Sequence, residues 1–354
     1  MSEATDEILF EKVGHWGVIT LNRPQALNAL TVDMVKAFHA HLSQWDGQPS
    51  VKAVLVKGAG DRAFCAGGDV RWVVETARRD ADAAAIFFRE EYRNNSALHH
   101  FPKPCVALID GVVMGGGVGV SVHGDFRVAG DKTLFAMPET GIGLFPDVGG
   151  GYFMPRLRDG LGLYYALTGE RAGAADCMAA GIATHYVPTP ERVALEKALM
   201  DLPLGAHPHS EIEETLDQFA GDPGDATLND IRPAIAETFQ GHERIEDLIA
   251  GLEARGGEFA GTVLKTLSRM SPTSLKLTFE QMRRGHALDF DDVMRMEFRM
   301  VRRVLGGHDF FEGVRAQLID KDKTPTWSPP TLEGVDDAAI SAYFEPLGED
   351  ELTL

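Results

Sequence analysis

Residues 105–119 read CVALIDGVVMGGGVG, an apolar run that leads into a cluster of glycines. The apolar run Cys105–Ile109 predicts a buried strand, and a helix is expected to begin near Gly116, inside the glycine cluster. Short predicted strands and helices alternate, with loops of similar character, from Ile8 to about Glu191. This alternation predicts an α/β protein.

After Glu191 the pattern changes to a succession of helices. The expected helices are Arg192–Leu202, Glu211–Phe219, Asn229–Thr238, Arg244–Leu252, Ala260–Met270, Ser274–Arg284 and Phe290–Leu305. We therefore expect residues 1–200 to form the α/β core and residues 201–354 to form a helical C-terminal region. The tail of that region, Thr331–Leu354, carries seven Asp and Glu residues and no Lys or Arg.

Composition excludes several classes of protein. Of the 354 residues, 44% are hydrophobic, which is ordinary for a globular protein and excludes global disorder. The formal net charge of −19 argues against a protein that coats DNA or RNA, because such a protein needs a basic surface. An anionic small ligand is not excluded, since local cations and backbone N–H groups can hold one.

The cysteines and the apolar runs bear on the compartment. Three scattered cysteines form no C-x-x-C pair, so we predict neither a disulfide framework nor a cysteine zinc site. The acidic first residues, MSEATDEILFEK, lack the features of a signal or transit peptide. No run approaches the length of about 18 apolar residues that crosses a membrane. We expect a cytoplasmic protein, or a mature form without its presequence, and no membrane or nucleic-acid partner.

Three glycine-rich segments call for a reason, because glycine is entropically costly to order. They are Phe64–Asp69, Met114–Gly119 and Phe145–Gly151. They serve either tight turns or a backbone that approaches a ligand closely with bare N–H groups, two of which can form an oxyanion hole. A dinucleotide-binding fingerprint also competes for the second segment, but it requires Gly or Ala where Val120 stands.

Taken together, these segments resemble the enoyl-CoA hydratase/isomerase (crotonase) superfamily. The matching elements, within residues 8–190, are Leu21–Pro24, Leu27–Leu30, Phe64–Asp69, Met114–Gly117, Met137–Glu139 and Gly141–Leu144. The resemblance implies a crotonase-like spiral of ββα units, an acyl-CoA substrate and a homo-oligomer, either a trimer or a hexamer. It also implies that the N–H groups of Gly68 and Gly116 form an oxyanion hole for the thioester oxygen.

One departure from the hydratase pattern bears on the expected activity. Hydratases of this family use two glutamates; Glu139 matches one of them, but Gly119 stands at the position of the other. Hydration needs one carboxylate to position water and another to exchange its proton with the alkene, so the pair is broken here. Asp147 is a second carboxylate that could converge on the same pocket.

Other features resemble the subgroup of this family that hydrolyses 3-hydroxyisobutyryl-CoA in valine breakdown. They are the segment Phe88–Tyr92, the stretch from Val120 to Phe153 and the long helical C-terminus. This resemblance assigns substrate contacts to Glu91, Gly116, Glu139 and Asp147. It implies no cofactor, because coenzyme A is part of the substrate, and no metal.

Thioester chemistry gives the carboxylates their expected roles. Glu139 either activates water as a general base or attacks the carbonyl to form a mixed anhydride. Asp147 orients the substrate hydroxyl or assists proton transfer, and Glu91 contacts the hydroxyacyl end. Each also has a structural interpretation: Glu139 in the first turn of a helix, Asp147 as a turn cap and Glu91 on a solvated helix face.

Two other functions stay open at this point. The chain could catalyse enoyl-CoA hydration or isomerisation with Glu139 alone, or it could bind acyl-CoA without turning it over. A serine hydrolase is disfavoured because the stretch around Ser121 lacks the final glycine of a nucleophile elbow. The pairs His99-His100 and His207–His209 lack carboxylate or cysteine neighbours at the spacing of a metal site.

Overall fold

The computed structural model describes residues 6–354, which form two compact units. Of the described residues, unit 1 contains those up to Gly68, together with Arg93–Phe135 and Arg171–Thr227. Unit 2 contains Asp69–Tyr92, Ala136–Glu170 and Leu228–Leu354. Each unit is therefore assembled from three separate stretches of chain. The division that the sequence predicts, between residues 200 and 201, falls inside unit 1 and stays a prediction.

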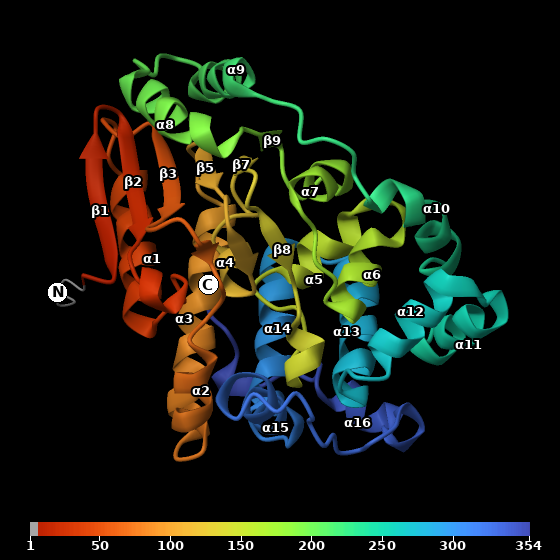
Figure 1. Ribbon diagram of the computed structural model, residues 1–354. Helices are drawn as coiled ribbons and strands as arrows, with labels where there is room; N and C mark the ends of the chain where they lie inside the picture. The colour runs from red at the N-terminus through yellow and green to blue at the C-terminus, as the bar shows by residue number, and fades with distance from the viewer. Residues whose placement is uncertain (1–5) are drawn as a thin grey trace. The chain divides into compact units, whose positions relative to one another are not determined.

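Unit 1 contains a six-stranded sheet (Figure 1). In their order across the sheet, the strands are β1 (Ile8–Val13), β2 (Trp16–Leu21), β3 (Ala53–Gly58), β5 (Cys105–Leu108), β7 (Phe126–Ala129) and β9 (His185–Tyr186). β1 and β2 form an antiparallel hairpin, with Val13 opposite Trp16, and the remaining neighbours are parallel. The sequence predicts this hairpin, with strands at Ile8–Val13 and Trp16–Leu21 and a turn at Gly14, and the structure confirms it.

A second sheet contains β4 (Ala63–Cys65), β6 (Val112–Met114) and β8 (Leu134–Ala136). From β3 onward the chain alternates between the two sheets, so that successive turns add a strand to each. This is the spiral that the family resemblance implies. β4 lies inside Gly58–Asp69, where the sequence predicts only a loop, because three residues are too few to show a strand's alternation.

The core of unit 1 lies between the six-stranded sheet and two helices. The helices of unit 1 as a whole are α1 (Val32–Asp46), α4 (Gly116–Gly119), α7 (Ala174–Ala180), α8 (Arg192–Asp201) and α9 (Pro208–Phe219), and the two that cover this core are α8 and α9. Side chains of β2, β3, β5 and β7 pack against Leu195 and Leu199 of α8 and against Ile212 and Leu216 of α9. Burying one such side chain stabilises the fold by about 1.5–3 kcal/mol. This core holds the six-stranded sheet of unit 1 against α8 and α9.

Unit 2 is mainly helical. Its helices are α2 (Val70–Ala77), α5 (Gly150–Phe153), α6 (Leu161–Thr168), α10 (Leu228–Thr238), α11 (Ile245–Arg255), α12 (Gly257–Leu267), α13 (Pro272–Gly285), α14 (Phe290–Val304), α15 (Asp309–Val314) and α16 (Asp337–Ala342). Helix α3 (Ala81–His99) contributes its residues up to Tyr92 to this unit. The helices expected after residue 191 are all present, with ends that differ by a few residues.

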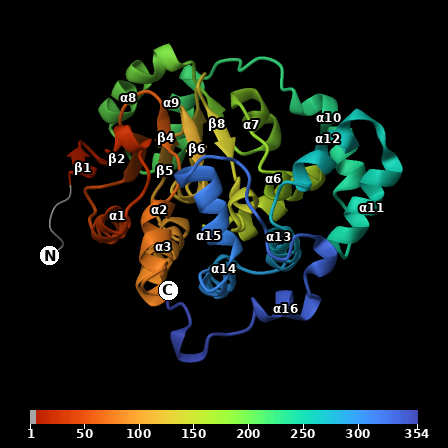
Figure 2. The ribbon, with the colours of Figure 1, turned by 60° about the horizontal axis from the view of Figure 1, so that its bottom comes forward.

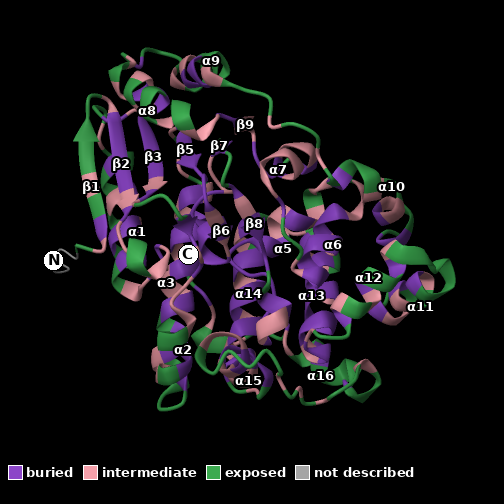
Figure 3. Ribbon diagram, in the orientation of Figure 1, coloured by how far each residue is buried: buried purple, intermediate pink, exposed green. Residues whose placement is uncertain are grey.

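Helices α13 and α14 are the buried centre of this unit. They run side by side (Figure 2), and most of their residues are buried, whereas α11 exposes much of its surface (Figure 3). Such burial of long helices in the C-terminal part makes them part of the framework of unit 2 rather than a covering layer. Among the polar residues that they carry, Gln281 and Glu297 are both fully buried.

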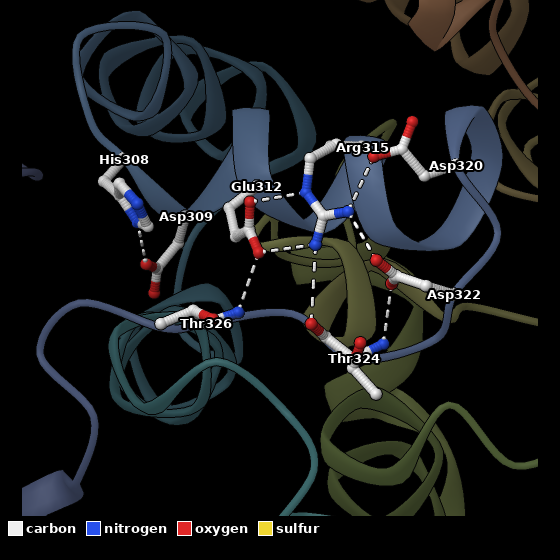
Figure 4. Close-up of polar contacts among 8 residues, drawn as sticks. All are labelled: His308, Asp309, Glu312, Arg315, Asp320, Asp322, Thr324 and Thr326. Carbon is white, nitrogen blue, oxygen red and sulfur yellow. Dashed lines mark hydrogen bonds and ion pairs between the residues drawn. The ribbon is translucent and has the colours of Figure 1, made fainter.

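One arginine organises the chain after α15 (Figure 4). The Arg315 guanidinium donates to both carboxylate oxygens of Glu312, at 2.8 and 2.9 Å. It also donates to Asp320 at 2.7 Å and to Asp322 at 2.6 Å. A bidentate pair with two further carboxylates is a charge network of the kind that fixes a loop, rather than a lone surface pair.

No helix within residues 6–354 is long and apolar enough to cross a membrane.

Candidate active site

Two glycine-rich segments follow neighbouring parallel strands of unit 1. β4 pairs with β6, with Cys65 opposite Val113, so the residues that follow the two strands emerge at the same edge of the sheet. These residues include Gly67-Gly68 and Gly115-Gly116. A Cβ on Gly117 would lie 2.2 Å from the carbonyl oxygen of Cys65, so only glycine allows the start of α4 to pack there.

The amide N–H groups of Gly68 and Gly116 are the predicted oxyanion donors. A Cβ on Gly67 would lie 3.8 Å from the amide nitrogen of Gly116, which shows how closely the two segments approach. Within residues 6–354, neither N–H donates a hydrogen bond. Two unused backbone donors on adjacent loops can bind an oxygen atom on which negative charge develops.

The three predicted carboxylates, Glu91, Glu139 and Asp147, lie together in unit 2. Glu91 is on α3, Glu139 begins a 3-10 turn at Glu139–Ile142, and Asp147 lies just before α5. Their exposed fractions are 2%, 5% and 4%, respectively. The interpretation of Glu91 as a solvated helix residue is therefore wrong. The charge of Asp147 raises the pKa of both glutamates, which links the three groups electrostatically.

Tyr92 orients the side chain of Asp147. Its hydroxyl donates to Oδ2 of Asp147 at 2.9 Å. The Tyr92 ring packs edge-on against Phe88 and Phe298, with ring centroids 6.1 and 6.3 Å apart. The backbone carbonyl of Asp147, and not its side chain, accepts the turn hydrogen bond from Gly150 at 2.8 Å. Sequence reasoning missed Tyr92, because nothing local indicates that its hydroxyl meets a residue 55 positions further on.

Burial shifts the ionisation of these carboxyl groups to higher pH. It raises the pKa of Asp147 to about 7, although the hydrogen bond from Tyr92 lowers it. Burial, followed by the charge of Asp147, raises the pKa of Glu139 well above its usual value. Burial also raises the pKa of Glu91, with repulsion from the neighbouring carboxylates added. Carboxyl groups with raised pKa values exchange protons near neutral pH and can serve as acids and bases.

A fourth carboxylate, Glu297 on α14, joins Glu91, Glu139 and Asp147 in a group that we call the carboxylate cluster. Its Oε2 accepts the N–H of Gly149 at 2.9 Å, and its Oε1 accepts the N–H of Gly151 at 2.8 Å. Oε1 also accepts from Nε2 of Gln281 at 3.0 Å. Burial raises the pKa of Glu297 to about 8, while these three donors lower it.

Sequence reasoning also missed Glu297, although the pattern of α14 carries a signal for it. Glu297 stands four residues after Val293 and four before Val301, and all three are buried on one face of α14. A carboxylate in the middle of an apolar helical stripe needs hydrogen-bond donors from elsewhere in the fold. The identity of those donors, in a turn 148 residues earlier, is visible only in the structure.

Two carboxylate oxygens of the cluster have no hydrogen-bond partner within residues 6–354. They are Oε1 of Glu91 and Oε2 of Glu139. Leaving a buried acceptor unpaired costs about 1–3 kcal/mol. A water molecule or a ligand hydroxyl would supply the missing donors. Unpaired polar atoms among groups with shifted pKa values are typical of a functional site.

Other side chains considered from the sequence have structural partners. The Ser121 hydroxyl donates to the carbonyl oxygens of Gly117 and Val118, at 2.8 and 3.0 Å, so the backbone beside it occupies this hydroxyl. Among the residues that the structure describes, no three His, Cys, Asp or Glu side chains are arranged to hold a metal ion.

Known sequences show which family this chain resembles. A model of the enoyl-CoA hydratase/isomerase family matches residues 16–344. The chain is 48% identical, over 358 residues, to a protein of Danio rerio described as 3-hydroxyisobutyryl-CoA hydrolase, mitochondrial, covering 100% of this chain and 93% of that protein. A Homo sapiens protein of the same description is 45% identical over 354 residues, covering 99% and 92%.

Solved structures with the same architecture are also found. One is described as a carnitinyl-CoA dehydratase from Mycobacterium thermoresistibile, with a TM-score of 0.91, 40% identity and coverage of 99% of each chain. Another is described as an enoyl-CoA hydratase from Rhodobacter sphaeroides 2.4.1, with a TM-score of 0.89, 36% identity and coverage of 99% and 100%. Both likenesses include the helical C-terminal region, so the predicted fold class is confirmed.

Proposed function

The chain belongs to the enoyl-CoA hydratase/isomerase family, and from this membership we propose that it hydrolyses the thioester 3-hydroxyisobutyryl-CoA. The products are 3-hydroxyisobutyrate and coenzyme A. The observation that carries the proposal is the grouping of Glu139 with Asp147, two buried carboxyl groups with raised pKa values, in a chain with glycine at position 119. The relatives described as this hydrolase support it along nearly their whole length.

In this proposal, the N–H groups of Gly68 and Gly116 bind the thioester oxygen. Negative charge builds on that oxygen when the carbonyl carbon is attacked. Backbone donors hold the oxygen more strongly as its charge grows, which lowers the barrier rather than merely binding the substrate. Loss of one such donor typically slows an acyl-transfer enzyme by about 10²–10³-fold.

Glu139 has two chemically balanced routes. As a general base, its carboxylate takes a proton from water while the water oxygen bonds to the acyl carbon; the carbon–sulfur bond breaks, and the proton passes to the coenzyme A thiolate. As a nucleophile, the carboxylate forms a mixed anhydride and expels the thiolate, and water then cleaves the anhydride. The unpartnered Oε2 of Glu139 is free for either role.

Asp147 and Glu91 deal with the hydroxyacyl part in this proposal. The ionised carboxylate of Asp147, oriented by Tyr92, accepts a hydrogen bond from the substrate hydroxyl. Asp147 also assists proton transfer. Glu91 contacts the hydroxyacyl end, because its Oε1 is buried without a donor. Burial raises the pKa of Glu91 and so favours its protonated form. A protonated carboxyl both donates and accepts, which suits a hydroxyl partner.

The proposal is tested by measuring free thiol released from 3-hydroxyisobutyryl-CoA beside the hydration of crotonyl-CoA. We expect one thiol and one 3-hydroxyisobutyrate for each thioester consumed, and loss of this activity in Glu139→Gln. Hydration of crotonyl-CoA without thiol release would refute the hydrolase. Tight binding of the thioester with no turnover of either substrate would indicate an acyl-CoA-binding protein.

Enoyl-CoA hydration or isomerisation is the second candidate function. Two solved structures with the same fold, at 40% and 36% identity, are described as a dehydratase and a hydratase of acyl-CoA compounds. Against it stands Gly119, which is buried in α4 and has no side chain to act as the second acid–base group. The crotonyl-CoA assay decides between the two functions.

The two routes for Glu139 are separated by trapping. Borohydride added during turnover reduces a mixed anhydride and leaves Glu139 as the corresponding alcohol, which peptide mass analysis detects. The alcohol is expected only if Glu139 is the nucleophile. Its complete absence, with normal thiol release in the same sample, would leave the general-base route. Glu139→Gln is the control for reduction elsewhere.

We also propose a setting for this activity. The hydrolase would act in valine breakdown, without a cofactor, and as a homotrimer or hexamer; light scattering of the purified protein tests the last point. The three cysteines are buried and free, which suits a reducing compartment such as the cytoplasm. The relatives named above are described as mitochondrial, so imaging of the full-length protein in its own cells is the appropriate test.

A further inference from the structure

We propose that Glu297, together with Gln281, positions Asp147 for catalysis by holding the backbone on both sides of it. This inference rests on the proposed function of Asp147. Glu297 is on α14 and Gln281 is on α13, and each has an exposed fraction of 0%. In this proposal neither residue touches the reacting atoms.

The contacts of the two side chains bracket Asp147. Before it, the carbonyl oxygen of Pro146 accepts a hydrogen bond from Nε2 of Gln281 at 2.7 Å. After it, the N–H groups of Gly149 and Gly151 donate to the two carboxylate oxygens of Glu297. Gln281 and Glu297 are also hydrogen-bonded to each other, so the two ends of the turn are tied to one buried polar pair.

The turn that follows Asp147 needs such support. Val148 has φ +52°, a left-handed conformation that a β-branched residue rarely adopts, and Gly149 follows with φ +85°. This backbone turns the N–H groups of the glycines towards α14. A conformation of this kind persists only where the surroundings over-determine it, and the three hydrogen bonds to Glu297 and Gln281 do so here.

The Glu297–Gln281 pair packs tightly against Gly151. A Cβ on Gly151 would lie 2.9 Å from Oε1 of Glu297 and 3.0 Å from Nε2 of Gln281, so a larger residue could not occupy this position without displacing the pair. Helix α14 also reaches Asp147 by a second path, because Phe298 packs against the Tyr92 ring whose hydroxyl holds the Asp147 side chain. One helix thus supports both the backbone and the side chain of Asp147.

Removal of the carboxylate is the direct test. Glu297→Gln keeps the size and one oxygen, but it presents an NH₂ group to one of the two glycine N–H donors. We expect kcat for thioester hydrolysis to fall about 10²-fold, the loss typical of a misplaced catalytic group, while KM changes less than about threefold. Asp292→Asn, which removes an exposed carboxylate from the same helix, is the matched control and is expected to leave kcat unchanged.

A double variant separates positioning from a general loss of structure. In an Asp147→Asn background, adding Glu297→Gln is expected to lower kcat by less than about threefold, because the residue it positions is already disabled. Equal losses in the two backgrounds would refute the proposal. Gln281→Met offers an independent variant should Glu297→Gln fold poorly; it is expected to lower kcat about 10-fold, and an unchanged kcat would count against the proposal.

Hydrogen exchange makes the inference independent of the assigned substrate. We expect the amides of Gly149 and Gly151 to exchange faster in Glu297→Gln than in the unaltered chain, and no change in Asp292→Asn. If the unaltered chain releases no thiol, the proposed function fails, while this measurement still decides whether Glu297 holds the turn around Asp147. If it does release thiol but exchange and kcat are unaffected by Glu297→Gln, the inference alone fails.

Discussion

Replacing Tyr92 by phenylalanine removes one hydroxyl group from the buried carboxylate cluster and leaves the ring in place. That hydroxyl donates to Oδ2 of Asp147 at 2.9 Å and lowers the pKa of Asp147, which burial holds at about 7. Without it, the ionised form of Asp147 loses a stabilising partner and the neutral form loses less. The pKa of Asp147 is therefore expected to rise.

The size of the shift follows from the strength of the bond. A hydrogen bond to a charged group contributes about 1.5–3 kcal/mol, and one pKa unit corresponds to about 1.4 kcal/mol. The pKa of Asp147 should thus rise by about 1–2 units. At pH 7 the ionised fraction would fall from about one-half to roughly 1–10%, so thiol release at this pH should drop about 5–50-fold and recover as the pH rises above about 9.

The assay is thiol release from 3-hydroxyisobutyryl-CoA at closely spaced pH values, with kcat and KM determined at each. Tyr186→Phe is the matched control, because it also removes a hydroxyl that donates to a carboxylate, that of Asp131 in unit 1. Its pH profile should match that of the unaltered protein. A Tyr92→Phe profile with an unchanged midpoint, or a loss of equal size at every pH, would refute the reasoning.

Three further predictions address other parts of the molecule. Glu139→Gln should lower kcat by about 10²–10⁴-fold with the protein still folded, because it removes either the base or the nucleophile; an activity within twofold of the original would exclude both roles. Gly117→Ala should lower thiol release by about 10²–10³-fold or prevent folding, because its Cβ would lie 2.2 Å from a carbonyl oxygen at the end of β4. Gly173→Ala is the control and should leave the activity unchanged, because its Cβ would meet no neighbouring atom within 4 Å. The ion pair with Arg315 lowers the pKa of Glu312 to about 2, below its unfolded value of about 4.5, so its stabilising contribution is present above pH 5 and is lost as the pH falls towards 2. Urea unfolding of Glu312→Gln should accordingly differ from that of the original chain most at pH 6 and least at pH 3, and a pH-independent difference would contradict this assignment.

The sequence predicts those parts of the fold that depend on local pattern. The first hairpin, the strand at Cys105 and the helices after residue 191 follow from apolar periodicity, capping and breakers within windows of about 5–15 residues. Such a local pattern does not predict β4, because this strand has only three residues, Ala63–Cys65. A local pattern also cannot predict how the chain divides into units, because each unit joins three stretches that are distant in sequence.

The sequence likewise predicts only part of the candidate site. Glycine clusters and the family resemblance pointed to Gly68, Gly116, Glu139 and Asp147, whose roles remain proposals. The partners that orient them were missed. Tyr92 lies 55 residues from the carboxylate that it holds, and no local pattern in the sequence specifies such a pairing. Long-range hydrogen bonds of this kind have no period and no motif, so they become visible only when the chain is folded.

The carboxylate cluster also has a consequence for the order in which the protein can be made. Gln281 is 135 residues downstream of Pro146, which it contacts, and Glu297 is 148 residues downstream of Gly149. At about 5–20 residues per second, a ribosome needs about 7–30 s to cover the second interval. During synthesis, the turn around Asp147 therefore waits in water, with its glycine amides unpaired, until α14 has emerged. A truncated chain that stops before α14 contains all three predicted acidic residues and still lacks the carboxylate that holds their turn in place.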